Sequence, residues 1–183
     1  SKYFVGVDNY SLGSQTGEYA VKYIKENMGG KAKIAVIGIH KYEIGMDRVN
    51  GFLDAIKNEP GIEVIANQDA ELKEEGMTIT ENILQAHPET DLIWAWNQTS
   101  MEGAVAALLG GKRVDIPVMG TDMSVDIAKH MLADNAFLAA VTTQQPYEIG
   151  YTAVKNAAEL ARSGNVDSEV LVPLMTYTKT IKM

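Results

Sequence analysis

Side chains that can bind hydroxyl or carboxylate groups stand at or shortly past the ends of several β-rich runs in this sequence. Together they are His40, Tyr42, Glu43, Arg48, Asn97, Gln98, Thr121, Asp122, Thr143, Gln144 and Gln145. Their guanidinium, amide, carboxylate and hydroxyl groups supply both hydrogen-bond donors and acceptors. Because no catalytic set arises from their spacing, they are typical of a binding site for a polar small molecule.

The main enzyme motifs are missing from the sequence. There is no GxGxxG after the first predicted strand, and no GxxxxGK[ST], GxSxG or HExxH motif. The absence of cysteine excludes thiolate nucleophiles and Cys-type zinc sites. His40, His87 and His130 lie in different elements without metal-ligand spacing. We therefore expect no enzyme activity, no catalytic residue, no metal and no cofactor, although a spatial triad of Ser100, His40 and Asp122 stays open.

Short β-rich runs alternate along the chain with segments of helical periodicity. The runs are Tyr3–Val7, Lys33–Ile39, Ile62–Ala66, Leu92–Trp96, Ile116–Thr121, Phe137–Thr142 and Val170–Thr178. Such alternation predicts right-handed crossovers and a parallel sheet with helices on both faces. The chain is too short for an eight-unit barrel. The expected fold class is α/β, a three-layer α/β/α doubly wound parallel sheet.

Ligands of open α/β sheets bind beyond the carboxyl ends of the strands, which is where the polar residues stand. Arg48 lies near the start of its predicted helix, where the macrodipole disfavours a cation. Its planar fork of donors suits a sugar or a carboxylate, and the alternative is a solvated Arg paired with Asp47 or Glu43. Asp122 is either a ligand contact or the N-cap of a helix that begins near Ser124.

Two further positions after the fourth run carry open alternatives. Asn97 is a binding candidate or a turn residue. Trp94 and Trp96 alternate on one strand, so one or both can belong to the core. Trp96 is the better binding candidate because it adjoins the loop, and an aromatic face commonly covers the apolar side of a sugar ring.

The composition describes one core-forming domain, or a domain plus part of another. The chain has 183 residues, of which 46% are hydrophobic and 22% charged, and its net charge is −8. Its 16 Lys and Arg residues are scattered among 24 acidic ones, which argues against a nucleic-acid partner. No charged-then-apolar leader opens the chain, so we expect a cytosolic protein or a mature or truncated form of an exported one.

Further motifs follow one another in a fixed order over nearly the whole chain. They are Val7-Asp8-Asn9 with Gly13 and Gly17, the stretch 45–52, the stretch 84–88, Trp96-Asn97 with Gly103-Ala104, Gly120-Thr121-Asp122, and Gln144-Gln145-Pro146 with Ile149-Gly150. In these motifs the chain resembles the type I periplasmic sugar-binding proteins of ABC transporters, most closely the ribose-binding group. Lac-repressor-type regulators share several of the marks, so the effector-sensing domain of a transcription regulator is the alternative.

The resemblance implies a protein of two lobes, joined by crossing segments, that closes on a ligand. This chain matches the second lobe, and the first lobe is missing from it. Residues 1–9 correspond to a hinge and first-lobe remnant, and residues 10–143 to the ligand-binding lobe. Residues 144–183 correspond to a hinge crossing plus a helix and a strand of the first lobe.

The resemblance also implies which residues contact the ligand, a monosaccharide-sized polyol. The family's sugar-contacting positions fall on Arg48, Asn97, Asp122 and Gln144, to which Trp96, Gln98 and His40 are added as candidates from the strand-end pattern. The family often has Asn-Asp where this chain has Asn97-Gln98, and an aromatic residue where it has Leu72. These differences leave the identity of the sugar open.

Partners and location follow from the same resemblance. A full-length protein of this family is extracytoplasmic, either periplasmic or lipid-anchored at the cell surface, and delivers its sugar to an ABC permease or a chemoreceptor. In this chain the helix near 147–163 and the strand near 170–178 carry an apolar face meant for the first lobe. Because uncovered apolar faces and strand edges promote association, we expect a homodimer or an exchange of these elements.

Overall fold

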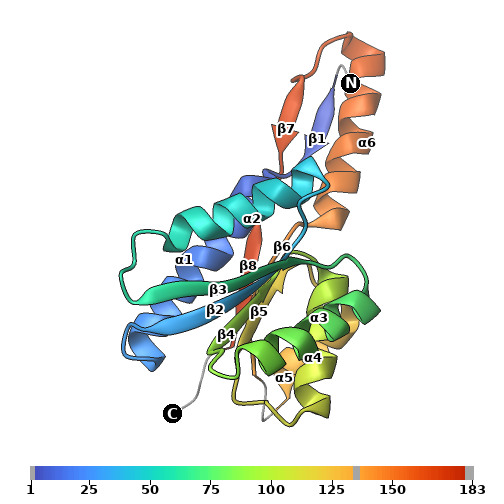
Figure 1. Ribbon diagram of the computed structural model, residues 1–183. Helices are drawn as coiled ribbons and strands as arrows, with labels where there is room; N and C mark the ends of the chain where they lie inside the picture. The colour runs from blue at the N-terminus through green and yellow to red at the C-terminus, as the bar shows by residue number, and fades with distance from the viewer. Residues whose placement is uncertain (1–2, 134–136, 180–183) are drawn as a thin grey trace.

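The computed structural model describes residues 3–133 and 137–179, in which strands and helices alternate (Figure 1). The strands are β1 (Phe4–Gly6), β2 (Ala32–Gly38), β3 (Ile62–Asp69), β4 (Leu92–Ala95), β5 (Val118–Thr121), β6 (Leu138–Thr143), β7 (Glu169–Leu171) and β8 (Met175–Thr178). The helices are α1 (Asn9–Asn27), α2 (Glu43–Ile56), α3 (Lys73–Ala86), α4 (Gln98–Gly110), α5 (Val125–Leu132) and α6 (Pro146–Ser163).

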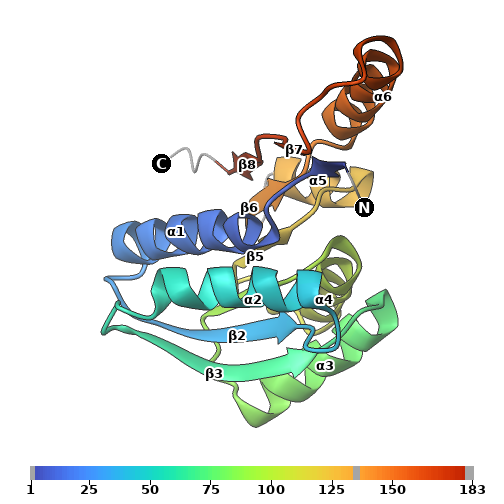
Figure 2. The ribbon, with the colours of Figure 1, turned by 90° about the horizontal axis from the view of Figure 1, so that it is seen from above.

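The described strands form a six-stranded sheet, in the order β3-β2-β4-β5-β6-β8, and a separate two-stranded sheet of β1 and β7. In the larger sheet neighbouring strands are parallel except at the edge, where β8 runs antiparallel to β6. Helices α1 and α2 cover one face, and α3, α4 and α5 cover the other (Figures 1 and 2). The predicted three-layer α/β/α arrangement is confirmed.

Both faces of the sheet are packed, because its central strands bury alternate side chains on opposite sides. On β2, Ile34 contributes to the core under α1 and α2, and Ile37 contributes to the core under α3 and α4. On the first side Trp94 and Phe52, the largest fully buried side chains of the described residues, stack with ring centroids 4.5 Å apart. The cores on the two faces hold the strands of the sheet in fixed register.

Helices α1 and α2 cross at very close range. A Cβ atom on Gly13 would lie 1.9 Å from the carbonyl oxygen of Arg48, and one on Gly51 would lie 2.0 Å from the carbonyl oxygen of Tyr10. Only glycine leaves room for backbones to approach this closely. The crossing therefore fixes the position of α2, and with it that of Arg48, against the start of α1.

Strands β1 and β7 and helix α6 form an outlying unit that extends away from the larger sheet (Figures 1 and 2). Val7, Leu12 and Val172 form a small core where the unit joins the main body. In α6, which is described in full, no residue is buried, and Tyr147 and Val154 are 78% and 72% exposed. The apolar face predicted for this helix is therefore covered only in part, because Ile149 packs against the small core while Tyr147 and Val154 stay exposed.

The predicted single strand Val170–Thr178 is wrong, because two strands in different sheets occupy this stretch. β7 pairs with β1, and β8 pairs with β6 in the larger sheet. Pro173 lies between them and has no N–H to donate to a strand ladder. Part of the predicted third segment, 144–183, thus lies in the larger sheet. Residues 1–2 of the predicted first segment and residues 180–183 of the third lie outside the described residues.

Candidate functional site

The loops that follow β4, β5 and β6 begin side by side at the carboxyl edge of the larger sheet. The backbone N–H of Trp96 donates to the carbonyl of Ile37 over 3.0 Å, which ties the end of β4 to β2. The N–H of Asp122 donates to the carbonyl of Thr142 over 2.9 Å, which ties the end of β5 to β6. Residues far apart in the chain therefore meet at one rim, as expected for parallel strands.

Arg48 lies at the centre of this rim and is 4% exposed. Its Nε donates to Asn9 Oδ1 over 2.9 Å, and its Nη1 donates to Asp122 Oδ2 over 2.7 Å. The same Nη1 lies 3.2 Å from the carbonyl oxygen of Trp96 and 3.3 Å from Thr121 Oγ1. The alternative of a solvated Arg paired with acidic residues of its own helix is wrong.

One edge of the Arg48 guanidinium remains available. Its Nη2 has no hydrogen-bond partner among the residues that the structure describes. Of the fully buried side-chain nitrogen and oxygen atoms in the described residues, only Trp94 Nε1 has no hydrogen-bond partner. Nη2 therefore still meets solvent and retains two N–H donors for a ligand.

Asp122 accepts hydrogen bonds on both carboxylate oxygens. Oδ2 binds Arg48, and Oδ1 accepts from Gln144 Nε2 over 3.0 Å. Its backbone is left-handed, with φ of 69°, a conformation that few residues other than glycine and Asn or Asp adopt. The N-cap of α5 is Ser124, whose Oγ accepts from the N–H of Ile127 over 3.1 Å. Asp122 is thus part of the rim rather than the cap.

Asn97 is the N-cap of α4 rather than a simple turn residue. Its Oδ1 accepts from the N–H of Ser100 over 2.8 Å, and its Nδ2 donates to the carbonyl of Glu71 over 3.2 Å. The next residue, Gln98, donates from Nε2 to Glu102 Oε1 over 3.3 Å. Both amides are therefore held in one orientation at the rim.

A hollow of about 380 Å³ lies beside these side chains, within the range of roughly 300–1,000 Å³ that small-molecule sites occupy. It is lined by Asn97, Gln98, Thr99, Asp122, Met123, Thr143, Gln144 and Pro146. A larger hollow of about 1210 Å³ adjoins it and extends over α5, β8 and the start of α6, past apolar side chains such as Met131 and Tyr177. The concentration of polar groups makes the smaller hollow the candidate site.

Trp96 lies under Arg48 and is 6% exposed, so it offers almost no ring face to a ligand. Its Nε1 donates to the carbonyl of Ala70 over 2.7 Å, and the Arg48 Cζ lies 5.8 Å from a ring centroid of the indole. A guanidinium over an indole ring is attracted by the negative face of the ring. The structure thus shows Trp96 as a support of Arg48.

His40 stands at the carboxyl end of β2, outside the lining of the smaller hollow. Its ring and its backbone N–H both contact the carboxylate of Asp69. Burial raises the pKa of Asp69, but the hydrogen bonds from His40 outweigh it and leave that pKa below its ordinary value.

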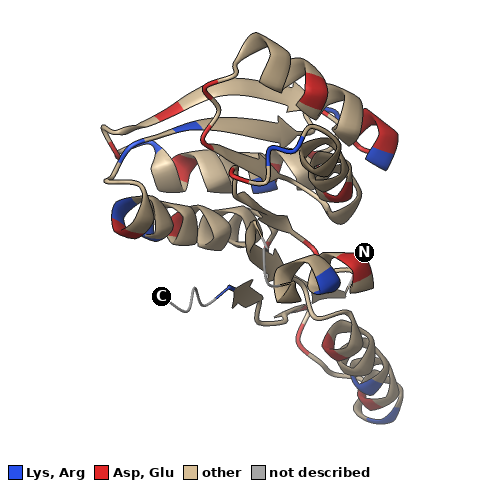
Figure 3. Cartoon of the chain, turned by 90° about the horizontal axis from the view of Figure 1, so that it is seen from below, with Lys and Arg blue, Asp and Glu red and all other residues tan. Residues whose placement is uncertain are grey.

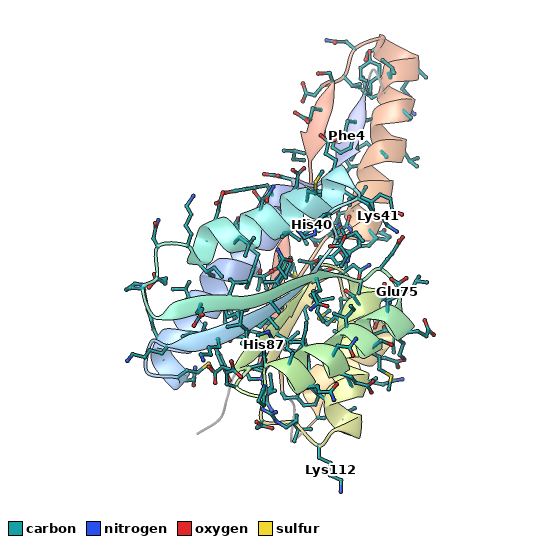
Figure 4. All side chains as sticks on the ribbon, in the orientation of Figure 1. Phe4, His40, Lys41, Glu75, His87 and Lys112 are labelled. Carbon is teal, nitrogen blue, oxygen red and sulfur yellow. The ribbon has the colours of Figure 1, made fainter. Side chains whose placement is uncertain are left out.

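His87 precedes β4, at the opposite end of the sheet from His40 (Figure 4). Within the described residues no group of three His, Cys, Asp or Glu residues can hold a metal ion.

The alternative triad of Ser100, His40 and Asp122 is wrong. Ser100 Oγ donates to Asn97 Oδ1 over 2.7 Å, while His40 contacts Asp69 and Asp122 pairs with Arg48. Each of the three side chains has a different partner, so they do not act on one another. The rim can hold a ligand through hydrogen bonds, but it lacks a nucleophile activated by a base.

Thr99, Met123 and Pro146 line the hollow without having been predicted as site residues, and two residues that hold the rim were missed as well. Asn9, which binds the Nε of Arg48, follows the first strand, as the other rim residues follow theirs. Glu102, which binds Gln98, stands four residues further along the same helix, a spacing that places two side chains on one face. Both patterns are visible in the sequence once strand ends and helix spacing are read together.

Charged groups of both signs are scattered over the surface, as Figure 3 shows. Over the residues that the structure describes, this view shows no basic stripe of the kind that binds nucleic acid. Among the helices of the described ranges, none combines the length and the apolar character needed to cross a membrane.

The sequence and the fold agree with one family of known proteins. Residues 1–165 match the family model of the periplasmic binding protein domain. The chain therefore belongs to the periplasmic binding protein domain family, and the resemblance to type I periplasmic sugar-binding proteins is confirmed.

Individual relatives support this assignment. The chain is 28% identical over 183 residues to the ABC transporter periplasmic-binding protein YphF of Escherichia coli (strain K12), covering 98% of this chain and 55% of that protein. It is 30% identical over 165 residues to the ribose import binding protein RbsB of Bacillus subtilis (strain 168), covering 89% and 52%. The chain thus spans about half the length of these curated relatives.

Solved structures show the same fold. An ABC transporter periplasmic solute binding protein from Actinobacillus succinogenes 130z, with bound D-allose, aligns with a TM-score of 0.86 at 26% identity. The alignment covers 97% of this chain and 62% of that one. The fold of this chain is therefore also found in a solute-binding protein with a bound sugar.

Proposed function

We propose that the protein containing this chain is the solute-binding component of an ABC-type sugar uptake or chemosensory system. The observation that carries the proposal is the rim of Arg48, Asp122 and Gln144 beside a hollow of about 380 Å³, in a fold shared with sugar-bound proteins. The ligand is a neutral, monosaccharide-sized polyol.

The chemistry of the rim supports a hydroxyl-rich ligand. Asp122 and the amides of Asn97, Gln98 and Gln144 line the hollow and supply acceptors and donors, while Arg48, which does not line it, holds Asp122 in place through Nη1. Because the charge of Arg48 is paired with Asp122 at 2.7 Å, the site has little net charge to offer an anion. A sugar, whose hydroxyls both donate and accept, matches such a mixture.

We place the second half of the cleft outside this chain, in a first lobe that closes on the ligand. In this proposal residues 10–143 are the ligand-binding lobe, and the segments 1–9 and 144–183 contain the crossings. A ligand held by one lobe is desolvated on one side only. Affinity for the isolated chain is then expected to be weaker by several factors of ten, each worth about 1.4 kcal/mol.

Native mass spectrometry and calorimetric titration of the full-length protein test this function. D-Ribose and D-allose are the first probes, because relatives are named as a ribose import binding protein and as a structure with D-allose bound. The expected result is stoichiometric binding of a monosaccharide that leaves unaltered, as it does from a binding protein rather than an enzyme. A co-purified nucleotide, or turnover of the sugar, would contradict the proposal.

The partners and the location are part of the same proposal. A solute-binding component works outside the cytoplasm, in the periplasm or lipid-anchored at the cell surface, and passes its ligand to a permease or a chemoreceptor. Fractionation of the source cells tests the location, and sugar uptake after deletion of the gene tests the transport role. Recovery of the protein in the cytosolic fraction would count against both.

The uncovered outlying unit leads us to propose that the chain alone dimerises through α6. Tyr147, Tyr151 and Val154 are 78%, 59% and 72% exposed on this helix. Analytical ultracentrifugation at micromolar concentration is expected to show a dimer that Val154→Lys dissociates. Leu109→Lys, at a 45% exposed position on α4, is the matched control and should leave the dimer intact. A monomer in the unchanged chain would refute this arrangement.

A further inference from the structure

A carboxylate supports the rim of the candidate site from one turn inside α4. The Glu102 side chain is 17% exposed, and its Oε1 accepts hydrogen bonds from Gln98 Nε2 over 3.3 Å and from Ser124 Oγ over 2.7 Å. Lys73 Nζ approaches its Oε2 at 4.0 Å. Gln98 opens α4 and Ser124 caps α5, so Glu102 joins the two loops that border the hollow.

The contact with Glu102 determines which end of the Gln98 amide is free. An ionised carboxylate accepts hydrogen bonds and donates none, so the amide must turn its NH2 group toward Glu102. The carbonyl oxygen, Oε1, has no hydrogen-bond partner among the described residues. Gln98 lines the hollow, so the atom it has free for a ligand is an acceptor.

We propose that Glu102 is a positioning residue that fixes the Gln98 amide, and that Gln98 thereby selects ligands with a hydroxyl donor at this side of the cleft. The inference rests on the proposed function of the hollow as a sugar site. An acceptor backed by a carboxylate also disfavours a ligand carboxylate or phosphate at the same place, because two acceptors facing each other share no proton. The selectivity thus arises from Gln98 together with Glu102.

Calorimetric titration of the full-length protein with D-ribose, D-allose and their monodeoxy derivatives tests the selectivity. Gln98→Ala and Glu102→Ala are each expected to weaken binding of the tighter sugar by about two- to tenfold. The double variant should bind no more weakly than Gln98→Ala, since Glu102 acts through Gln98. One monodeoxy derivative should bind the unchanged protein less tightly than its parent sugar, and Glu102→Ala should lose this difference. Additive losses, or discrimination that survives in Glu102→Ala, would overturn the proposal.

An exchange of the two side chains separates positioning from mere stability. In Gln98→Glu alone, two carboxylates stand four residues apart on one helix and repel each other. In the double variant Gln98→Glu with Glu102→Gln, the amide at position 102 donates to the carboxylate at position 98. The other oxygen of that carboxylate faces the ligand as an acceptor. The exchange is expected to return the affinity to within about twofold of the unchanged protein. Affinity as low in the exchange as in Gln98→Glu would contradict the positioning role.

A measurement without ligand distinguishes failure of this inference from failure of the proposed function. In the ligand-free protein, the hydrogen bond to Glu102 should shift one of the two side-chain NH2 proton NMR signals of Gln98 away from the free-amide value and slow its exchange with water. Glu102→Ala should move that signal back toward the free-amide value and speed its exchange, while Ser124→Ala, which removes the other partner of Glu102, should leave it unchanged. Signals unchanged in Glu102→Ala refute the positioning role even if sugar binds, and a protein that binds no sugar refutes the proposed function whatever these signals show.

Discussion

Arg48 and Asp122 lie 74 positions apart in the chain, and Arg48 Nη1 and Asp122 Oδ2 stand 2.7 Å from each other. Each partner is also bound by a residue of a segment that leads to the outlying unit. Asn9 accepts from Arg48 Nε over 2.9 Å, and Gln144 donates to Asp122 Oδ1 over 3.0 Å. The ion pair therefore connects the rim of the sheet to two of the crossings between main body and outlying unit.

Removal of the Arg48 charge is expected to abolish sugar binding and to destabilise the fold. In Arg48→Ala, Asp122 keeps only Gln144 as a partner, and breaking a largely buried pair of this kind costs about 2–4 kcal/mol. Arg48→Lys should rescue little, because an ammonium cannot reproduce the planar fork that serves Asn9 and Asp122 together. Calorimetry and urea unfolding measure the two effects.

The control for this substitution is Arg113→Ala. Arg113 pairs with Asp115 over 3.2 Å at the surface, where an ion pair contributes at most about 1 kcal/mol. This variant should bind sugar normally. An unchanged titration in Arg48→Ala would remove Arg48 from the site.

The amide of Asn9 is expected to affect ligand affinity without touching the hollow. Asn9→Ala leaves the Nε of the nearly buried Arg48 without its acceptor, which costs about 1–2 kcal/mol and lets the guanidinium reorient. Sugar affinity should fall about tenfold by calorimetry, at 1.4 kcal/mol per factor of ten. Asn27→Ala, near the other end of α1, is the matched control. Equal affinities in the two variants would show that Arg48 keeps its orientation without Asn9.

Glycine-to-alanine changes in two helices are expected to have opposite effects on stability. A Cβ on Gly13 would lie 1.9 Å from a backbone oxygen of α2, so Gly13→Ala must force the helices apart, at a cost of about 3 kcal/mol. Gly150 lies in α6 with no atom within 4 Å of an added Cβ, and Gly150→Ala should stabilise by about 0.5–1 kcal/mol. Thermal or urea unfolding measures both. Similar midpoints for the two variants would disprove the close crossing of α1 and α2.

Acid should weaken the fold partly through Asp69. Contacts from His40 hold the pKa of this carboxyl below its ordinary value of about 4. A lowered pKa means that the folded state favours the ionised form, so the stabilisation is present above about pH 4 and is lost as the pH falls further. Asp69→Asn should therefore lose less stability than the unchanged protein between pH 7 and pH 3, measured by urea unfolding.

The control for the acid experiment is Asp167→Asn, at an exposed position that follows α6. This variant should lose as much stability as the unchanged protein between pH 7 and pH 3. If Asp69→Asn behaves in the same way as the control, the contact with His40 does not contribute to the acid dependence.

The alternation of strands and helices was enough to predict the sheet, its layers and the edge at which the polar residues meet. The same pattern could not show that Trp96 lies under Arg48, because a sheet covered on both faces buries alternate side chains equally on each side. Nor does it distinguish Asp122 from Ser124 as the cap of α5, since both residue types favour that position. The division of Val170–Thr178 into two strands depends on partners far away in the chain.

Because β8 follows α6 and β7 in the chain but pairs with β6, the path of the backbone leaves the main body and comes back to it. During synthesis on the ribosome, the edge of β6 that pairs with β8 stays unpaired until α6, β7 and β8 have been made. Neither part of the molecule is then a continuous stretch of sequence that can be cut out and expressed alone. The order of the strands and helices along the chain therefore couples the folding of the main body to the folding of the outlying unit.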